Sequence, residues 1–343
     1  MLNNILTGIV VVLVFGFIIF FHELGHFIAA KKAGVKVNEF ALGMGPVLFK
    51  KQRGETTYAL RLFPIGGFVS MEGEDSESGD NRAFCNKSPL KRFVIIAAGA
   101  FMNLLLGYLI MLSLVMMSNG IATTEVHSFS EGATSSQYLQ AGDKIVGING
   151  KRVRTSNDIS FQLMREDDGI VDIDVIRDGQ KVKLEGVTFQ MEEIQDGIKA
   201  IKLDFIVKGV RKNALNVPVY AFDWTVSIVK QVWMSFVDLI GGRYSLNQLS
   251  GPVGVATAIG EASGKGLDYM LILVAIITVN LGIFNLLPIP ALDGGRLVFL
   301  LIEAVRGKPV NPDIEGFINV AGLCALMGLM VLVTFNDILK FFR

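Results

Sequence analysis

Four long apolar stretches recur along the chain and predict membrane-spanning helices. They run from Ile5 to Phe21, Phe93 to Met117, Met270 to Pro288 and Phe317 to Phe335, and none contains a charged residue. A helix rises 1.5 Å per residue, so about 20 apolar residues cross the hydrocarbon core of a bilayer. Each stretch approaches or exceeds that length. We expect the first to be retained, because it continues into a polar His-Glu motif instead of a small-residue cleavage site.

The segment between the first two spans carries an excess of positive charge. Residues 31–92 contain eleven Lys and Arg side chains and seven acidic ones, and pairs of basic residues stand at both membrane ends. Loops rich in Lys and Arg stay on the cytoplasmic side of a membrane. The pattern predicts that this loop is cytoplasmic and that both termini and the region after the second span lie outside.

Part of this loop has the pattern of a β-hairpin. Tyr58 to Met71 alternates between apolar and polar residues and is interrupted by Pro64 and by Gly66-Gly67. Alternation broken by glycines is typical of two strands joined by a turn. Two roles stay open: a small cytoplasmic hairpin, or a sheet edge that reaches the active site and pairs with an extended substrate.

The polar stretch after the second span, residues 121–208, has the pattern of a small soluble domain. Short segments alternate there with turn signals such as Ala141-Gly142-Asp143, Asn149-Gly150 and Asp178-Gly179. Closely spaced turns of this kind indicate a domain of short strands. We expect an independent domain on the extracytoplasmic side.

Residues 209–266 connect this domain to the last two spans. Pro218 to Leu239 is rich in aromatic residues and carries few charges. Such a segment is typical of an amphipathic helix at the membrane interface and is too interrupted to predict a fifth span. The predicted parts are therefore residues 1–120, with two spans and the β region, then 121–208, 209–266, and 267–343, with two further spans.

Composition removes one class of partner and narrows the metal chemistry. The chain is 51% hydrophobic, and its 32 Lys and Arg balance 32 Asp and Glu. Proteins that bind nucleic acids need a clustered excess of positive charge, so we expect no nucleic-acid partner. The apolar stretches make the lipid bilayer an expected partner. The two cysteines, Cys85 and Cys324, cannot build a cysteine-rich zinc module. Any metal must be bound by histidine and carboxylate.

A motif with metal-binding spacing stands at the end of the first apolar stretch. In His22-Glu23-Leu24-Gly25-His26, two imidazoles four residues apart share one face of a helix. Zinc accepts imidazole and carboxylate ligands and keeps a position open for water in catalytic sites, where Glu23 can take the proton of that water. The alternative is a pair of interfacial histidines, but ionisable groups at membrane depth usually mark function.

A catalytic zinc site needs a third protein ligand, which a carboxylate must supply here. The remaining histidine, His127, falls in the predicted domain across the membrane. Asp293 follows the third apolar stretch, within Asn285-Leu-Leu-Pro-Ile-Pro-Ala-Leu-Asp-Gly-Gly295. The prolines break the helix and the glycines permit a tight turn. We expect Asp293 on irregular backbone at membrane depth, which is tolerated where it lines a water-filled cavity.

Together, the two motifs resemble those of a known family. HExxH in the first span with NxxPxPxLDGG in the third resembles the site-2 protease family of intramembrane zinc metalloproteases, in its bacterial RseP-type branch with a single PDZ domain. The resemblance covers essentially the whole chain. It implies a polytopic α-helical membrane protein with about four transmembrane helices, a membrane-associated β-hairpin and an inserted PDZ-like α+β domain. It implies zinc as the cofactor, with metal ligands His22, His26 and Asp293 and catalytic residue Glu23.

The resemblance also implies residues that bind substrate. Asn285 matches a family asparagine that holds the substrate backbone or stabilises the oxyanion, the alternative being a helix-packing hydrogen bond. Gly99-Ala-Phe-Met-Asn103 resembles a GxxxN element, in which the small residue permits close helix approach and Asn103 makes a polar contact. The hairpin residues that resemble the family's membrane-reentrant, substrate-presenting β-loop are Gly66, Gly67 and Phe68.

The soluble domain resembles a PDZ module through the segment from Leu139 to Gly150, Leu-Gln-Ala-Gly-Asp-Lys-Ile-Val-Gly-Ile-Asn-Gly. PDZ domains bind peptides by adding a strand to a sheet edge. The segment from Glu131 to Ser136 lacks the usual Ser-Pro-Ala sequence before the groove. Two roles stay open for the domain: capture of a peptide ligand, or exclusion of substrates by size.

The sequence therefore predicts a multi-pass protease of the bacterial inner or plasma membrane, with its active site toward the cytoplasm and the PDZ-like domain outside. Its expected partners are single-span membrane proteins, of the anti-sigma factor or remnant signal-peptide type. Two other classes stay open: a metal transporter or zinc-binding scaffold, and a PDZ receptor for which Glu23 and Asp293 are dispensable. The glutamate within HExxH favours hydrolysis.

Overall fold

Four apolar helices form the framework of the chain, and they are the four predicted spans. α1 (Leu2–Lys32), α2 (Pro89–Met117), α6 (Leu267–Leu286) and α8 (Pro312–Lys340) are each long and apolar enough to cross a membrane. The chain is a multi-pass membrane protein. The computed structural model describes all residues except 1, 75–77, 196–197, 244–249 and 341–343.

Large apolar side chains cover the outer surfaces of these helices. Leu13 on α1, Phe101 on α2 and Phe317 on α8 are 65%, 67% and 75% exposed, respectively. Contact between water and a contiguous apolar surface is unfavourable, whereas contact with the apolar tails of lipids is not. The exposed face of the bundle is therefore the face that the bilayer covers.

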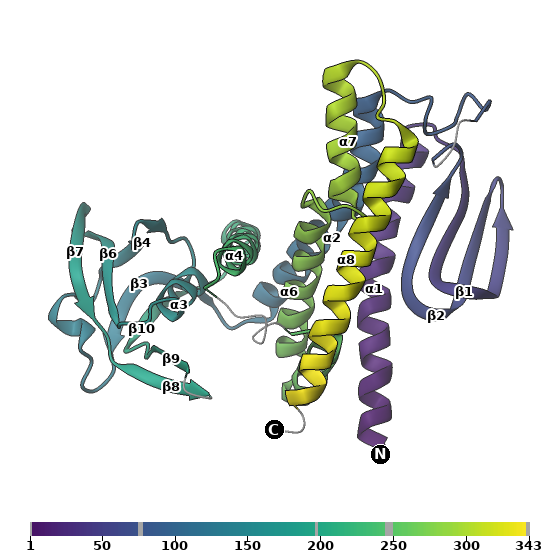
Figure 1. Cartoon of the computed structure of the whole chain (residues 1–343). Coiled ribbons are helices and arrows are strands. Elements are labelled where there is room, and N and C mark those ends of the chain that lie inside the picture. The colour runs from purple at the N-terminus through teal and green to yellow at the C-terminus, as the bar shows by residue number, and fades with distance from the viewer. Residues whose placement is uncertain (1, 75–77, 196–197, 244–249, 341–343) are drawn as a thin grey trace. The chain divides into compact units, whose positions relative to one another are not determined.

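The residues cluster into two compact units, one formed by residues 1–110 and 232–343 and the other by residues 111–231. In the first unit, α1 begins and α8 ends at one end of the helical bundle, and α7 (Asp293–Arg306) lies at the other (Figure 1). The buried carboxylate of Asp337 on α8 accepts hydrogen bonds from the Gly251 and Gly254 amides, at 2.9 and 2.8 Å. This carboxylate satisfies orphan donors at the start of α5 (Pro252–Lys265).

A β-hairpin is present, but the prediction that Tyr58 to Met71 contains both of its strands and their turn is wrong, because these residues form one strand. β1 (Val37–Arg53) and β2 (Thr56–Met71) form a two-stranded sheet whose connecting turn is at Gly54 and Glu55. Residues 39–42 of β1 pair with 57–60 and also with 67–70. The first half of β1 therefore lies between two halves of β2, and Gly66, with φ of +78°, bends a single strand.

A buried apolar cluster joins this sheet to one end of the helical bundle. Side chains from the end of α1, both strands, the start of α2 and the inner face of α7 share it. Close packing of this kind fixes the relative positions of the elements, because removing one large buried side chain costs about 2–5 kcal/mol. The cluster contains Ala30, Val35, Val37, Phe40, Val69, Met71, Phe84, Ile95, Ile96, Leu297 and Leu300.

The second unit is built around a β domain, as the turn-rich pattern predicts. Its main sheet has the strand order β10-β3-β4-β6-β7, with β5 paired to β4. The strands are β3 (Ile121–Phe129), β4 (Lys144–Ile148), β5 (Lys151–Arg152), β6 (Ile170–Arg177), β7 (Gln180–Thr188) and β10 (Phe205–Val210). β8 (Met191–Gln195) pairs with β9 (Ile198–Ile201), and α3 (Ser156–Met164) and the short helix η1 (Ser135–Gln137) complete the domain.

The aromatic-rich segment forms a helix, α4 (Asn216–Ile240), which is not among the four helices apolar enough to span a membrane. Its first half packs against the start of α3 through polar contacts. The buried Ser227 hydroxyl donates to Asp158 at 2.6 Å, and Arg154 pairs with Asp223 at 3.2 Å. The part of α4 before residue 232 therefore belongs to the β-domain unit.

One buried ion pair holds the turn before β4. Arg177 Nε and Nη2 donate to the two carboxylate oxygens of Asp143, at 2.8 and 2.7 Å, and the Asp143 side chain is 1% exposed. Burial raises the pKa of Asp143, but hydrogen bonds from Arg177 and from the Gln140 amide outweigh burial and hold that pKa below its usual value. The carboxylate therefore stays ionised in the folded domain.

Replacing Arg177 by Met should destabilise the β domain by roughly 2–3 kcal/mol, because the buried carboxylate loses its charged donor. The folded pKa of Asp143 is the lower one, so the stabilisation is complete above about pH 4 and is lost as the pH falls through the folded pKa. Hydrogen exchange of residues 139–150 in the full-length protein measures this loss. Lys181→Met, which removes the more exposed pair with Asp174 at 3.1 Å, should change exchange little; equal effects of both variants would contradict the assignment.

Candidate metal centre

Two imidazoles stand on one face of α1, near its end. His22 and His26 are one turn apart, and their rings meet edge to face, with centroids 4.8 Å apart. Their side chains are 12% and 11% exposed. From Gly8 to Phe21 the helix α1 is apolar throughout, and directly after this run it places both rings in a largely buried site.

Glycines let α2 approach these rings closely. A Cβ atom at Gly25 would lie 2.3 Å from the Ala98 carbonyl oxygen. A Cβ atom at Gly99 would lie 2.2 Å from His26 Nε2 and 2.8 Å from His22 Cε1. The backbones of α1 and α2 are therefore in direct contact. Both imidazole rings pack against Gly99.

Asp293 reaches the rings from the start of another helix, α7. The chain leaves α6 at Leu286, passes the two prolines and re-enters a helix with Asp293 as its first residue, so the expectation of irregular backbone at that residue is wrong. A Cβ atom at Gly294 would lie 1.9 Å from the Leu287 carbonyl oxygen, so only glycine permits the loop to fold onto the first turn. The N-terminus of α7 also favours a negative charge at Asp293.

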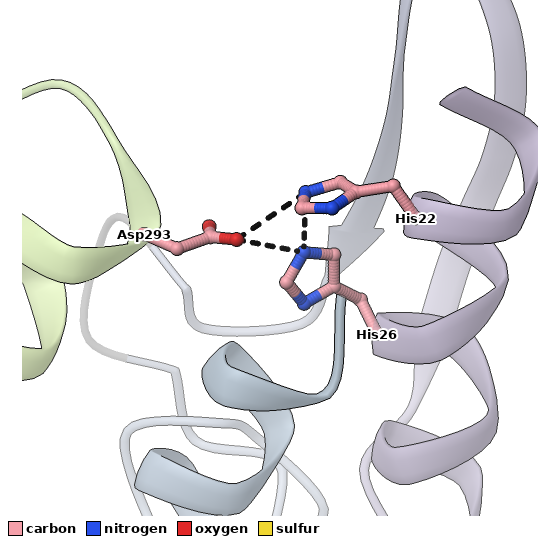
Figure 2. A group of neighbouring side chains, drawn as sticks. All are labelled: His22, His26 and Asp293. Carbon is pink, nitrogen blue, oxygen red and sulfur yellow. Dashed lines mark hydrogen bonds and ion pairs between the residues drawn. The ribbon is translucent and has the colours of Figure 1, made fainter. Parts of the chain in front are cut away.

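Three ligand atoms converge within this site. His22 Nε2 and His26 Nε2 are 3.2 Å apart, and each is 3.3 Å from Asp293 Oδ2 (Figure 2). Tetrahedral ligands about 2.0 Å from a zinc ion lie about 3.3 Å from one another, so the triangle has the edges of such a site. Asp293 Oδ2 is buried and receives no well-formed hydrogen bond from the described residues. A cation bound by all three atoms would satisfy it.

The outer nitrogens of the two rings are held by α2. His26 Nδ1 is 2.9 Å from the Ile95 carbonyl oxygen, and His22 Nδ1 is 3.3 Å from the side-chain amide of Asn103. A carbonyl only accepts, so Nδ1 of His26 carries the proton and its Nε2 presents a lone pair when the ring is neutral. The Ile95 carbonyl therefore sets the tautomer of His26 that a metal ligand needs.

Glu23 lies between the ligands and the sheet. It follows His22 on α1, and its carboxylate interacts electrostatically with His22, His26 and Asp293. A Cβ atom at Gly67 would lie 3.0 Å from Glu23 Cγ. The second half of β2 therefore packs directly against the residue predicted to act as the acid and base.

Asn285 and the predicted hairpin residues Gly66 and Phe68 lie in the same unit as His22, His26 and Asp293. They are not part of the group of three converging side chains. Asn285 occupies the last turn of α6 and is half-buried. Gly66 packs against Met44, whose Cε would lie 2.7 Å from an added Cβ, and the Phe68 ring stacks 5.1 Å below the guanidinium of Arg61. The hairpin residues thus shape the bend in β2.

Two ion pairs that sequence reasoning missed position α7. Arg92 on α2 pairs with Glu303, and these side chains are only 13% and 14% exposed. Arg296 pairs with Glu74, which follows β2. Arg92 and Glu303 are 211 residues apart in sequence, so no local pattern could have revealed their contact.

Comparison with known proteins identifies the family to which the chain belongs. The model of a family described as peptidase family M50 matches residues 10–329, which include both α1 histidines and Asp293. The chain belongs to peptidase family M50. The site-2 proteases are this family, so the resemblance carried by the two motifs is confirmed.

The relatives of this M50 chain match it over nearly its full length. It is 38% identical over 341 residues to a Clostridium acetobutylicum protein that carries the name of a zinc metalloprotease, with 96% of each chain covered. It is 32% identical over 420 residues to zinc metalloprotease RasP of Bacillus licheniformis, and 31% identical over 421 residues to regulator of sigma-W protease RasP of Bacillus subtilis. Both alignments cover 98% of this chain and 99% of the relative. The M50 chain is a zinc metalloprotease, and the transporter and receptor alternatives are set aside.

Gly99→Ala in this M50 chain should displace both imidazoles, because the new methyl group overlaps them. We expect zinc retention against a chelator to fall about tenfold or more and cleavage to fall about 100-fold. Metal analysis of the purified protein and a cleavage assay measure the two effects. Gly16→Ala is the matched control, because a Cβ atom there meets nothing within 4 Å. Unchanged zinc retention in Gly99→Ala would contradict the described contact.

Proposed function

We propose that this M50 zinc metalloprotease cleaves peptide bonds within the transmembrane segments of single-span proteins, and that His22, His26 and Asp293 hold the zinc. The observation that carries the proposal is the triangle of ligand atoms, 3.2–3.3 Å apart, inside a unit built from four apolar spans. Three ionisable groups at such a position are costly unless they serve one centre. A fourth position is left for water, as in catalytic zinc sites.

The chemistry follows from the position of Glu23. Zinc in the site supplies Lewis acidity that polarises the scissile carbonyl and makes water a nucleophile near neutral pH. Glu23 accepts the proton of the attacking water and delivers it to the leaving amine. Asn285, in the last turn of α6, donates its amide to the substrate carbonyl oxygen or to the backbone beside it. Burial of the site excludes bulk water until a substrate enters.

A helical substrate must unwind before its carbonyl can be attacked, because helix hydrogen bonds occupy the backbone. We place the unwound segment along residues 67–70 of β2. These residues pair with 39–42 on one side, and among the described residues no strand pairs with their other side. An edge of this kind binds an extended peptide through its backbone, and Gly67 holds the edge against Glu23.

The exposed apolar side chains of the sheet support its entry into the membrane. Large apolar residues are exposed along residues 44–49 of β1 and 60–63 of β2. Such a cluster is unfavourable in contact with water. A bilayer-facing position accounts for this surface and places the substrate-pairing edge at membrane depth. The side chains are those of Met44, Val47, Leu48, Phe49, Leu60, Leu62 and Phe63, which are 43–64% exposed.

The membrane orientation follows from the charge pattern. Lys31 and Lys32 end α1, and Lys91 and Arg92 begin α2, so this end of the bundle faces the cytoplasm of a bacterial plasma membrane. The metal centre is toward the cytoplasm and the β domain is outside. We assign the β domain as a PDZ-like module that excludes bulky substrates or binds a peptide on a free sheet edge.

Natural substrates are single-span proteins, either anti-sigma factors or signal-peptide remnants. A relative named regulator of sigma-W protease supports the first class. Both classes offer a lone helix with little folded mass outside the membrane, which suits a β domain that filters by size. The same hydrolytic reaction at the metal centre would cleave substrates of either class.

Glu23→Gln should lower cleavage of a tagged single-span test protein by about 100-fold or more, because the variant retains the shape of the side chain without its basicity. Zinc content should stay at the wild-type value, since Glu23 is no ligand. The assay uses purified full-length protein in detergent, with chelator-treated wild type alongside. Glu261→Gln on α5, an exposed position, is the matched control. Cleavage by Glu23→Gln at the wild-type rate would refute the catalytic role.

Cysteine cross-linking tests the pairing edge. In a Glu23→Gln protein with Cys85 and Cys324 replaced by serine, Ser70→Cys should form disulfides with cysteines placed along the unwound part of a substrate. The matched control is Gln52→Cys, which lies on the opposite edge of the same sheet. Cross-links of equal yield at both positions would show that substrates do not pair with the edge at residues 67–70.

A further inference from the structure

The side chain of Asn103 is a fully enclosed polar group beside the metal centre. It projects from α2 and is 0% exposed. Its Nδ2 is 3.3 Å from His22 Nδ1, whereas its Oδ1 is buried and has no hydrogen-bond partner among the described residues. A buried acceptor without a donor is costly, and native structures rarely contain one without a reason.

The two ends of this amide have opposite consequences for His22. If Nδ2 faces the ring, Nδ1 of His22 accepts, and the ring proton must sit on Nε2, which then has no lone pair for a metal. If Oδ1 faces the ring, Nδ1–H of His22 donates to it, and the Nε2 lone pair points at Asp293 and His26. Oxygen and nitrogen of an amide are nearly equal in size, so hydrogen bonding decides which end faces the ring.

Two observations favour the second orientation. It gives the orphaned Oδ1 a donor, the Nδ1–H of His22. It also makes His22 equivalent to His26, whose Nδ1 must donate to the Ile95 carbonyl oxygen at 2.9 Å. Both imidazoles then present Nε2 lone pairs to one centre, as the triangle of ligand atoms requires.

We propose that Asn103 is a positioning residue that accepts a hydrogen bond from His22 Nδ1–H through Oδ1 and so fixes the metal-binding tautomer of His22. This role deepens the proposed function, on whose metal centre it rests, and differs from the substrate contact expected for Asn103. Thr278 of α6 contacts the same residue away from the rings, where its hydroxyl donates to the Asn103 backbone carbonyl oxygen at 3.4 Å and touches neither imidazole.

The test compares zinc retention by full-length variants against a graded series of chelator concentrations, measured by metal analysis. Asn103→Asp keeps acceptor oxygens at the same position and has no donor when ionised. Asn103→Leu has a similar size and neither group. Thr278→Val is the packing control, because it removes a hydroxyl from the same buried contact without touching either ring. Absorption spectra of cobalt-loaded protein report the ligand geometry independently of cleavage.

We expect Asn103→Leu to weaken metal retention by about 10–100-fold and to alter the cobalt spectrum, whereas Asn103→Asp and Thr278→Val stay close to wild type. Rescue by Asp alone identifies the acceptor end of the amide, because a carboxylate cannot replace a donor. Equal losses in Asn103→Asp and Asn103→Leu would overturn the proposal, as would wild-type retention in Asn103→Leu.

His22→Ala separates this inference from the proposed function. Loss of zinc in His22→Ala with retention in Asn103→Leu would reject the positioning role and leave the metal centre standing. Wild-type retention in His22→Ala would reject the metal centre and the positioning role together.

Discussion

The close approach of α1 and α2 at Gly25 and Gly99 is the constraint on which the proposed metal centre depends. A side chain at Gly25 would strike the backbone of α2, and one at Gly99 would strike the imidazoles. The same approach brings the Ile95 carbonyl and the Asn103 amide to the outer ring nitrogens. An isolated HExxH helix would leave its rings free to rotate, whereas α2 limits each ring to one orientation.

The position of Asp293, the third proposed ligand, depends on tertiary contacts of another kind. Asp293 begins α7, which packs its inner face into the core shared by α1, α2 and the sheet. Arg92 and Glu303 then join α2 to α7 by an ion pair that is largely buried, where loss of either partner would strand a charge. The charges of Arg92 and Glu303 are thus tolerated inside an apolar bundle because they are paired with each other.

Local patterns were sufficient for the spans and for the candidate ligands. Uncharged runs of sufficient length can cross a membrane only as helices, and two histidines four residues apart must share a helix face. The turn of the sheet was not accessible in this way, because Gly66 can join two strands or bend one, and only the distant pairing with residues 39–42 decides. The immediate restart of the helix at Asp293 likewise depends on the packing of Gly294 against Leu287.

Among the described residues no strand pairs with the outer side of residues 67–70, and this has a consequence for how substrates are told apart. A strand edge contacts peptide backbone, which is the same in every protein, so pairing there discriminates weakly between side chains. Selection then falls on the cost of opening a helix, which glycine lowers by about 1 kcal/mol and proline by about 3 kcal/mol relative to alanine. Under the proposed function, the enzyme would cleave where a membrane helix unwinds most easily. Its cleavage sites would then share a low local helix stability more than they share particular side chains.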